Sequence, residues 1–145
     1  MPTPVSTPLL LITKDPSHPL ATLALRYARA WLDNQPEAAA DNPEPSTPQP
    51  ALKLFFYGDG ARTANRLYWQ SADQSNVTHD WQSLAKRYQM SLPVCVSTAL
   101  SRGVSDEDNS ARHQLTGDNI ATGFELVGLS ELALMLQDNC RLLAF

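Results

Sequence analysis

Short apolar runs alternate with segments of helical periodicity along the chain. The runs that predict strands are residues 9–13, 52–57, 92–96, 124–127 and 141–145. Several are apolar at almost every position, which is typical of strands that are buried on both faces of a parallel sheet. The pattern therefore predicts a central sheet whose strands are separated by helices.

The helical segments show apolar residues on one face. Residues 20–32 repeat apolar side chains at a spacing of three and four, with Ser17 as the expected cap and Pro19 in the first turn. Asp80 is the expected cap of the next helix. A last helix is predicted at about 130–137, with its inward positions at Leu132, Ala133 and Leu136.

The alternation of strands and helices predicts the fold class. About five such units favour an α/β fold, a three-layer α/β/α sandwich with a mainly parallel five-stranded sheet and right-handed crossovers. In sheets of this kind, working groups gather at the carboxyl ends of the strands.

The prolines divide the chain unevenly. Ten of the eleven prolines lie before Leu20 or between Asn34 and Ala51. The second stretch, NQPEAAADNPEPSTPQPA, is rich in Pro, Ala, Ser and acidic residues, a composition that buries little apolar surface. We expect one domain over residues 1–145, interrupted by a flexible insertion at about 34–51.

Composition and charge narrow the class of protein. Of the 145 residues, 43% are hydrophobic and 18% are charged, and the net charge of −4 argues against direct binding of nucleic acid. With no apolar run of membrane-span length and no signal-peptide pattern, we expect a cytoplasmic protein without membrane contact. Two cysteines far apart in sequence are then expected to be free thiols.

The stretch LPVCVSTALSRGV places a cysteine at a suggestive position. Cys95 lies near the carboxyl end of the third predicted strand, before a short helix that is expected to stop at Gly103. A helix start or a nearby cation favours the reactive thiolate, and Arg102 is the nearest cation in sequence. Free cysteine is also often buried as a small hydrophobe, so position alone leaves packing and reactivity both open. Cys140, which leads into the last strand, is expected to be structural.

Other polar candidates carry weaker signals. The segment YGDGA, residues 57–61, follows a strand but lacks both GxGxxG and the P-loop lysine, so we expect a tight turn. His18, His79 and His113 do not show the spacing of metal ligands. The acidic run at 106–108 is expected in a solvated loop.

Three segments resemble the DsrE/DsrF-like family of small sulfur-relay proteins, and its TusD-like branch most of all. They are FFYGDGARTAN (55–65), VCVSTALSRGV (94–104) and GFELVGLSELALMLQDNCRLLAF (123–145), of which the cysteine segment is the most specific. The resemblance extends over nearly the whole chain. It departs after the first strand, where TKDPSHP stands in place of the Gly-Pro-containing loop usual in the family.

The resemblance implies a sulfurtransferase whose Cys95 matches the persulfide-carrying cysteine of the family. It implies no metal or organic cofactor. It also implies a hetero-oligomer with TusB- and TusC-like subunits, a TusA-like sulfur donor and a TusE-like acceptor, on the way to 2-thiouridine at the tRNA wobble position. For the chain on its own, a homo-oligomer formed through the same surfaces stays open.

Three alternatives stay open at this point. A DsrE-like subunit of dissimilatory sulfur oxidation would use the same chemistry in another pathway. A non-catalytic scaffold member of the family would keep Cys95 buried. A flavodoxin-like nucleotide binder would use the loop at 58–60.

Overall fold

One five-stranded sheet, all parallel, organises the computed structural model, which describes residues 6–35, 51–137 and 139–145. The strand order is β4-β3-β2-β1-β5. The strands are β1 (Thr7–Ile12), β2 (Lys53–Phe56), β3 (Leu92–Cys95), β4 (Phe124–Val127) and β5 (Cys140–Ala144). All five predicted strands are confirmed, and every pairing is parallel. The predicted insertion at about 34–51 falls almost wholly on residues 36–50, outside the described residues.

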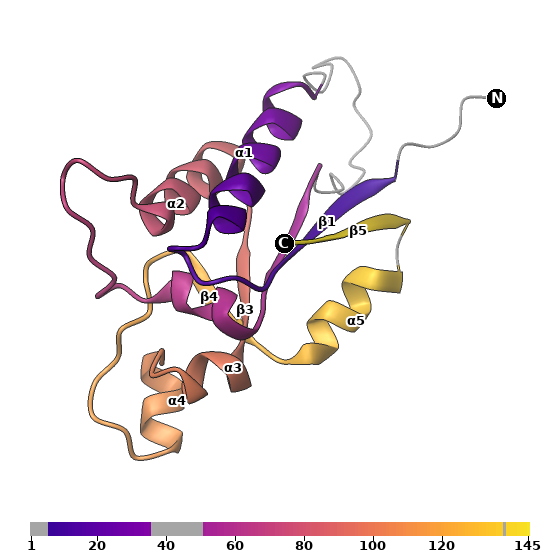
Figure 1. The fold of residues 1–145 in the computed structure, drawn as a ribbon. Coiled ribbons are helices and arrows are strands. Elements are labelled where there is room, and N and C mark those ends of the chain that lie inside the picture. Colours follow the sequence, from indigo (N-terminus) through magenta and orange to yellow (C-terminus); the bar gives the residue numbers. More distant parts are fainter. Residues whose placement is uncertain (1–5, 36–50, 138) are drawn as a thin grey trace.

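Helices lie on both sides of the sheet (Figure 1). They are α1 (Pro19–Asp33), α2 (Val77–Tyr88), α3 (Val96–Ser101), α4 (Glu107–Arg112) and α5 (Leu129–Gln137), with a 3₁₀-helix η1 (Gly58–Ala64) after β2. The α1 and α2 helices cover one face, whereas α5 lies on the other (Figure 1). Lys53 reaches this second face, where its Nζ donates to the backbone oxygen of Met135 in α5 at 3.2 Å.

The first helix begins at a different cap from the one predicted. His18, not Ser17, is the N-cap of α1, and its Nδ1 accepts a hydrogen bond from the backbone N–H of Leu20 at 3.0 Å. The Ser17 hydroxyl instead donates to Asp15 Oδ1 at 2.7 Å. Because Pro19 has a fixed φ suited to the first helical position, the helix begins directly after His18.

Two acidic predictions are also corrected. Asn76, not Asp80, caps α2, and Asp80 lies in the first helical turn, where a carboxylate still interacts favourably with the helix dipole. The acidic run 106–108 starts a helix and is not a loop: Asp106 is the N-cap of α4, and its carboxylate accepts from the Asn109 N–H at 2.8 Å. Short polar side chains at helix starts often compete for the cap, so sequence alone did not single out the right one.

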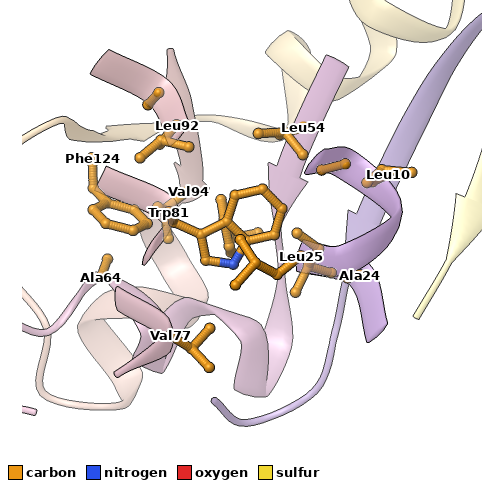
Figure 2. Packing of buried hydrophobic residues seen from close by; sticks show 14 of the residues in the cluster. Leu10, Ala24, Leu25, Leu54, Ala64, Val77, Trp81, Leu92, Val94 and Phe124 are labelled. Carbon is orange, nitrogen blue, oxygen red and sulfur yellow. The ribbon is translucent and has the colours of Figure 1, made fainter. Parts of the chain in front are cut away.

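The main core fills the space between the sheet and the α1/α2 pair. Trp81 of α2 is fully buried and meets the ring of Phe56 edge to face, with centroids 5.6 Å apart. Figure 2 shows Trp81 at the centre of this cluster, near Leu25, Val94 and Phe124. Alternate residues of the strands therefore point toward α1 and α2, and those between them point toward α5.

The α5 helix does not bury the face that its sequence predicts. None of its residues is buried, and Ala133 and Leu136 are exposed, whereas Leu132 is partly buried. The prediction for Ala133 and Leu136 is wrong because the segment LSELALMLQ is apolar around most of its circumference, so periodicity did not select one face.

Candidate functional site

Cys95 stands at the junction between a strand and a helix. It is the last residue of β3 and the N-cap residue of α3, with φ −60° and ψ 119°. The Thr98 hydroxyl donates to the backbone oxygen of Cys95 at 3.3 Å, which helps close the first turn of α3. The predicted placement at the carboxyl edge of the sheet and the predicted stop at Gly103, with φ +76°, are both confirmed.

The thiol is buried on the α5 face of the sheet. Its relative exposure is 1%. Val94 belongs to the α1/α2 core, so its neighbour Cys95 points to the opposite face. Cys95 pairs in register with Val127 of β4, and extending the Phe56–Val94 register by one residue places Tyr57 on its other side. Tyr57 is 37% exposed and Val127 is partly buried, so Tyr57 is the more exposed of these two neighbours.

Arg102, the nearest cation in sequence to the thiol, binds elsewhere. Its Nε donates to Asp59 Oδ1 at 2.9 Å, and its Nη1 donates to the Thr98 oxygen at 3.2 Å and the Ser101 hydroxyl at 3.1 Å. The hydrogen bond from Arg102 to Asp59, together with the positive charges of Arg102, Arg62 and Lys14, holds the pKa of Asp59 below its usual value. Arg102 therefore fastens the end of α3 to the loop after β2.

Gly60 shows why the YGDGA segment needs its glycines. A Cβ on Gly60 would lie 2.0 Å from the backbone oxygen of Ile12 at the end of β1. The predicted tight turn is in fact the start of the seven-residue helix η1, and Gly58 enters it at φ +60°. Close packing against β1 therefore accounts for Gly60 without a bound phosphate.

Four charged side chains form a charged rim at this edge of the sheet: Asp15, Asp59, Arg62 and Arg102. Arg62 Nε lies 3.8 Å from Asp15 Oδ2 and 4.0 Å from Asp59 Oδ1. Since Asp15 follows β1, Asp59 and Arg62 follow β2, and Arg102 follows β3, the rim links three neighbouring loops at the carboxyl edge. These side chains are exposed or partly exposed, so they are available to a protein that approaches this edge.

The Asn119 side chain connects three other residues by hydrogen bonds, a role that the sequence did not predict. Its Nδ2 donates to the Gly103 oxygen at 2.8 Å and to Asn65 Oδ1 at 3.1 Å, and its Oδ1 accepts from the Ser105 N–H at 2.9 Å. The amide thus ties the chain after α3 to the end of η1. These partners lie up to 54 residues away in sequence, so no local pattern pointed to Asn119.

A shallow hollow of about 250 Å³ adjoins this network. Its lining includes the apolar side chains of Leu67 and Leu115 and the polar side chains of Thr116, Asp118 and Asn119. Asp118 is paired with Arg66, whose Nη1 lies 3.4 Å from Asp118 Oδ1.

The structure separates the remaining sequence candidates. Cys140 begins β5 and is partly buried, at the amino edge of the sheet and therefore opposite Cys95. His18, His79 and His113 belong to three different helices or caps. Within residues 6–35, 51–137 and 139–145, no three His, Cys, Asp or Glu side chains are grouped as metal ligands would be. No helix in this part of the chain is both long and apolar enough to span a bilayer.

Comparison with known proteins identifies the family to which the chain is similar. A model of the DsrE/DsrF-like family matches residues 9–145. The chain is 40% identical over 93 residues to the sulfurtransferase TusD homolog of Aliivibrio fischeri, covering 64% of this chain and 72% of that protein. It is also 40% identical over 112 residues to sulfurtransferase TusD of Sodalis glossinidius, covering 77% of this chain and 76% of that protein.

A solved structure shares the fold. The crystal structure of the ychN protein from E. coli matches with a TM-score of 0.67 at 15% identity, over 96% of this chain and 99% of that one. This match confirms the predicted α/β fold.

Proposed function

Because the chain belongs to the DsrE/DsrF-like family, we propose that it is a sulfurtransferase subunit in which Cys95 carries sulfur as a persulfide. The observation that carries the proposal is the position of Cys95, at the carboxyl end of a central parallel strand and the start of a helix, in a chain whose relatives are named sulfurtransferase TusD. This edge is where parallel α/β sheets assemble their working groups.

The chemistry is an exchange at sulfur. The Cys95 thiolate attacks the terminal sulfur of a donor persulfide, a new S–S bond forms, and the donor cysteine leaves as a thiolate. The product is Cys95–S–SH. An acceptor thiolate then attacks the outer sulfur, and Cys95 leaves as a thiolate. No electron is gained or lost overall, and the exchange requires neither a metal nor an organic cofactor.

The burial of Cys95 sets a condition for this exchange. At 1% exposure, the sulfur is out of reach of a donor in the closed structure. Transfer therefore requires local opening of the groups around it, and exposed Tyr57 is the neighbour with the least packing to lose. We infer that docking of a donor or acceptor protein on the charged rim accompanies this opening.

The relatives named sulfurtransferase TusD support a Tus-type sulfur relay as the pathway. We propose relay of sulfur in the cytoplasm for 2-thiolation of the tRNA wobble uridine, in a complex with TusB- and TusC-like subunits, from a TusA-like donor to a TusE-like acceptor. The net charge of −4 suits a subunit that contacts other proteins and leaves the tRNA to them. A DsrE-like role in sulfur oxidation would use the same exchange.

The second candidate function is a non-catalytic scaffold. The single observation in its favour is the buried thiol, because a structural cysteine is expected to be buried and unreactive.

Intact-protein mass spectrometry separates the two functions. Reduced wild type, Cys95→Ser and Cys140→Ser are exposed to a persulfide donor that is active on a control protein. We expect wild type and Cys140→Ser to gain the mass of one sulfur atom, and Cys95→Ser to gain none. An unmodified wild type would support the scaffold, and a loss of the adduct only in Cys140→Ser would overturn the assignment of Cys95.

A further inference from the structure

The Cys95 sulfur has no hydrogen-bond partner among the described residues. Although Cys95 is the N-cap residue of α3, its side chain makes no capping hydrogen bond. Arg102 is engaged with Asp59, and the Thr98 hydroxyl donates to the backbone oxygen of Cys95 and not to its sulfur. At 1% exposure, the thiol is also shielded from water. A thiolate at this position would therefore be buried without a partner, which is costly.

Sulfur transfer requires this thiolate twice. Cys95 is a thiolate when it attacks the donor persulfide. It becomes one again when an acceptor thiolate attacks the outer sulfur of Cys95–S–SH, because the S–S bond breaks and both of its electrons stay on the Cys95 sulfur. A hydrogen-bond donor beside the sulfur would lower the free energy of the charge in both steps.

Tyr57 is placed to supply this donor. Its backbone is extended, with φ −137° and ψ 152°, so it continues the alternation of β2. Because Phe56 points into the α1/α2 core, Tyr57 points to the face on which the Cys95 thiol lies. The register between Phe56 and Val94, extended by one residue, places Tyr57 beside Cys95 on a strand about 4.8 Å away.

The backbone of Tyr57 is fixed, whereas its hydroxyl is unpartnered. The Tyr57 N–H donates to the Ile12 oxygen at 2.9 Å, and the Tyr57 oxygen accepts from the Gly60 N–H at 3.0 Å. The hydroxyl makes no hydrogen bond to the described residues, and the side chain is 37% exposed. Local opening can therefore turn the ring without moving its point of attachment away from the sulfur.

On the basis of the proposed sulfur exchange, we propose that the Tyr57 hydroxyl donates a hydrogen bond to the Cys95 sulfur whenever that sulfur is a thiolate. Val127, the strand neighbour on the other side of Cys95, is apolar and has no donor in its side chain. The proton stays on the Tyr57 oxygen, because an ordinary phenol, with a pKa of about 10, is a weaker acid than a thiol, with about 8.5. Tyr57 thus stabilises the charge without exchanging a proton or an electron.

Ser97 carries another hydroxyl close to Cys95 in sequence. It lies in the first turn of α3 and is exposed, whereas the thiol is buried on the α5 face of the sheet. Since the Cys95 side chain does not cap α3, its sulfur is not directed at this turn. Ser97→Ala is therefore the matched control for the loss of a hydroxyl near Cys95.

The pH dependence of Cys95 alkylation tests the hydrogen bond. Wild type, Tyr57→Phe and Ser97→Ala react with iodoacetamide between about pH 6 and 9.5, where a thiol titrates and a phenol stays mostly neutral, and peptide mapping gives the rate at Cys95. We expect the pH midpoint of the reaction to lie about one unit higher in Tyr57→Phe than in wild type, because a hydrogen bond to a charged group is lost. Ser97→Ala should keep the wild-type midpoint.

Charged groups are the same in wild type and in Tyr57→Phe. On the elements around the thiol, these groups are the charged rim, Lys14 after β1, Glu125 of β4 and Glu131 of α5. Their effect on the sulfur is therefore equal in the two proteins. A change in access to the thiol would scale the rate at every pH by one factor and leave the midpoint in place, so a shift of the midpoint reports the hydroxyl.

The outcomes distinguish this hydrogen bond from the proposed function. With circular dichroism verifying the fold of each variant, an unchanged midpoint in Tyr57→Phe would overturn the hydrogen bond, and so would an equal shift in Ser97→Ala. The midpoint does not depend on persulfide formation. A wild type that takes up no sulfur in the mass-spectrometric assay would contradict the proposed function, whereas a sulfur-loaded wild type with an unshifted Tyr57→Phe would contradict the hydrogen bond alone.

Discussion

Arg102 and Asp59 join two loops of the candidate site, with Arg102 Nε 2.9 Å from Asp59 Oδ1. The pair connects the end of the helix that follows Cys95 to the start of η1. Arg102, the nearest cation in sequence to the thiol, thus holds the two segments beside the thiol together.

The pair makes stability depend on pH. The hydrogen bond from Arg102 lowers the pKa of Asp59 in the folded protein, so the folded state favours the carboxylate. This contribution is fully present above the unfolded pKa, about 3.9, and is lost as pH falls through the lower folded value. We expect Asp59→Asn to be less stable than wild type at pH 7, with the difference vanishing toward the acid end. Urea unfolding of both proteins between pH 3 and 7 measures it.

A difference between Asp59→Asn and wild type that stayed constant over this pH range would contradict the ion pair as its source. Asp73→Asn gives a comparison without an arginine: the Ser71 hydroxyl and the Asp73 backbone lower the pKa of Asp73, so this variant should also lose its difference from wild type toward low pH.

Gly60→Ala tests the contact between η1 and β1. A methyl group 2.0 Å from the Ile12 oxygen forces the backbone of η1 away from the sheet, and we expect a loss of about 2 kcal/mol or more in the free energy of unfolding. Gly128→Ala is the matched control, because its nearest contact, Ser130 Oγ at 3.5 Å, is an ordinary one. Equal stability of the two variants in urea would show that η1 shifts at no cost.

Tyr57→Ala tests access to the thiol. If the Tyr57 ring limits approach to Cys95, its removal makes local opening easier, and an easing by about 1.4 kcal/mol raises the rate of alkylation about tenfold. We expect Cys140, which is partly buried, to react before Cys95 in wild type. Peptide mapping after a timed exposure to iodoacetamide gives both rates. An unchanged rate at Cys95 would mean that another group controls the opening.

Asn119→Ala removes three hydrogen bonds at once, to Gly103, Asn65 and Ser105. We expect a loss of about 2–3 kcal/mol in the free energy of unfolding, because the backbone groups at the end of α3 lose their partners. Asn119→Asp keeps an acceptor for the Ser105 N–H but loses the donor to Gly103, so it should lie between wild type and Asn119→Ala. The same stability for Asp and Ala would contradict a role for the retained acceptor.

The strands could be predicted because their chemistry is local. Residues 9–13 and 92–96 are apolar runs, and a strand buried in a parallel sheet needs little else to mark it. The placement of Cys95 at a strand end followed from the same reasoning. The family resemblance noted in the sequence is confirmed by the match over residues 9–145.

Apart from the helix caps, where adjacent polar residues compete, the errors arose where a structure depends on distant residues. α5 is apolar on several sides, and nothing in its own sequence says that the sheet leaves Leu136 exposed. The partner of Arg102 is 43 residues away, so its direction was not visible from the cysteine segment. The depth of Cys95 also depends on neighbouring strands, and position in one strand did not predict its burial.

The two ends of the connection between α1 and β2 are suitable positions for attaching a label. α1 ends at Asp33 and β2 begins at Lys53, both at the amino edge of the sheet, whereas Cys95 closes β3 at the carboxyl edge. A fluorophore or an affinity tag attached at Gln35 or Ala51, next to these two ends, would thus lie at the amino edge, opposite the thiol. Sulfur loading could then be followed on a surface-bound or labelled protein without the label competing for the donor.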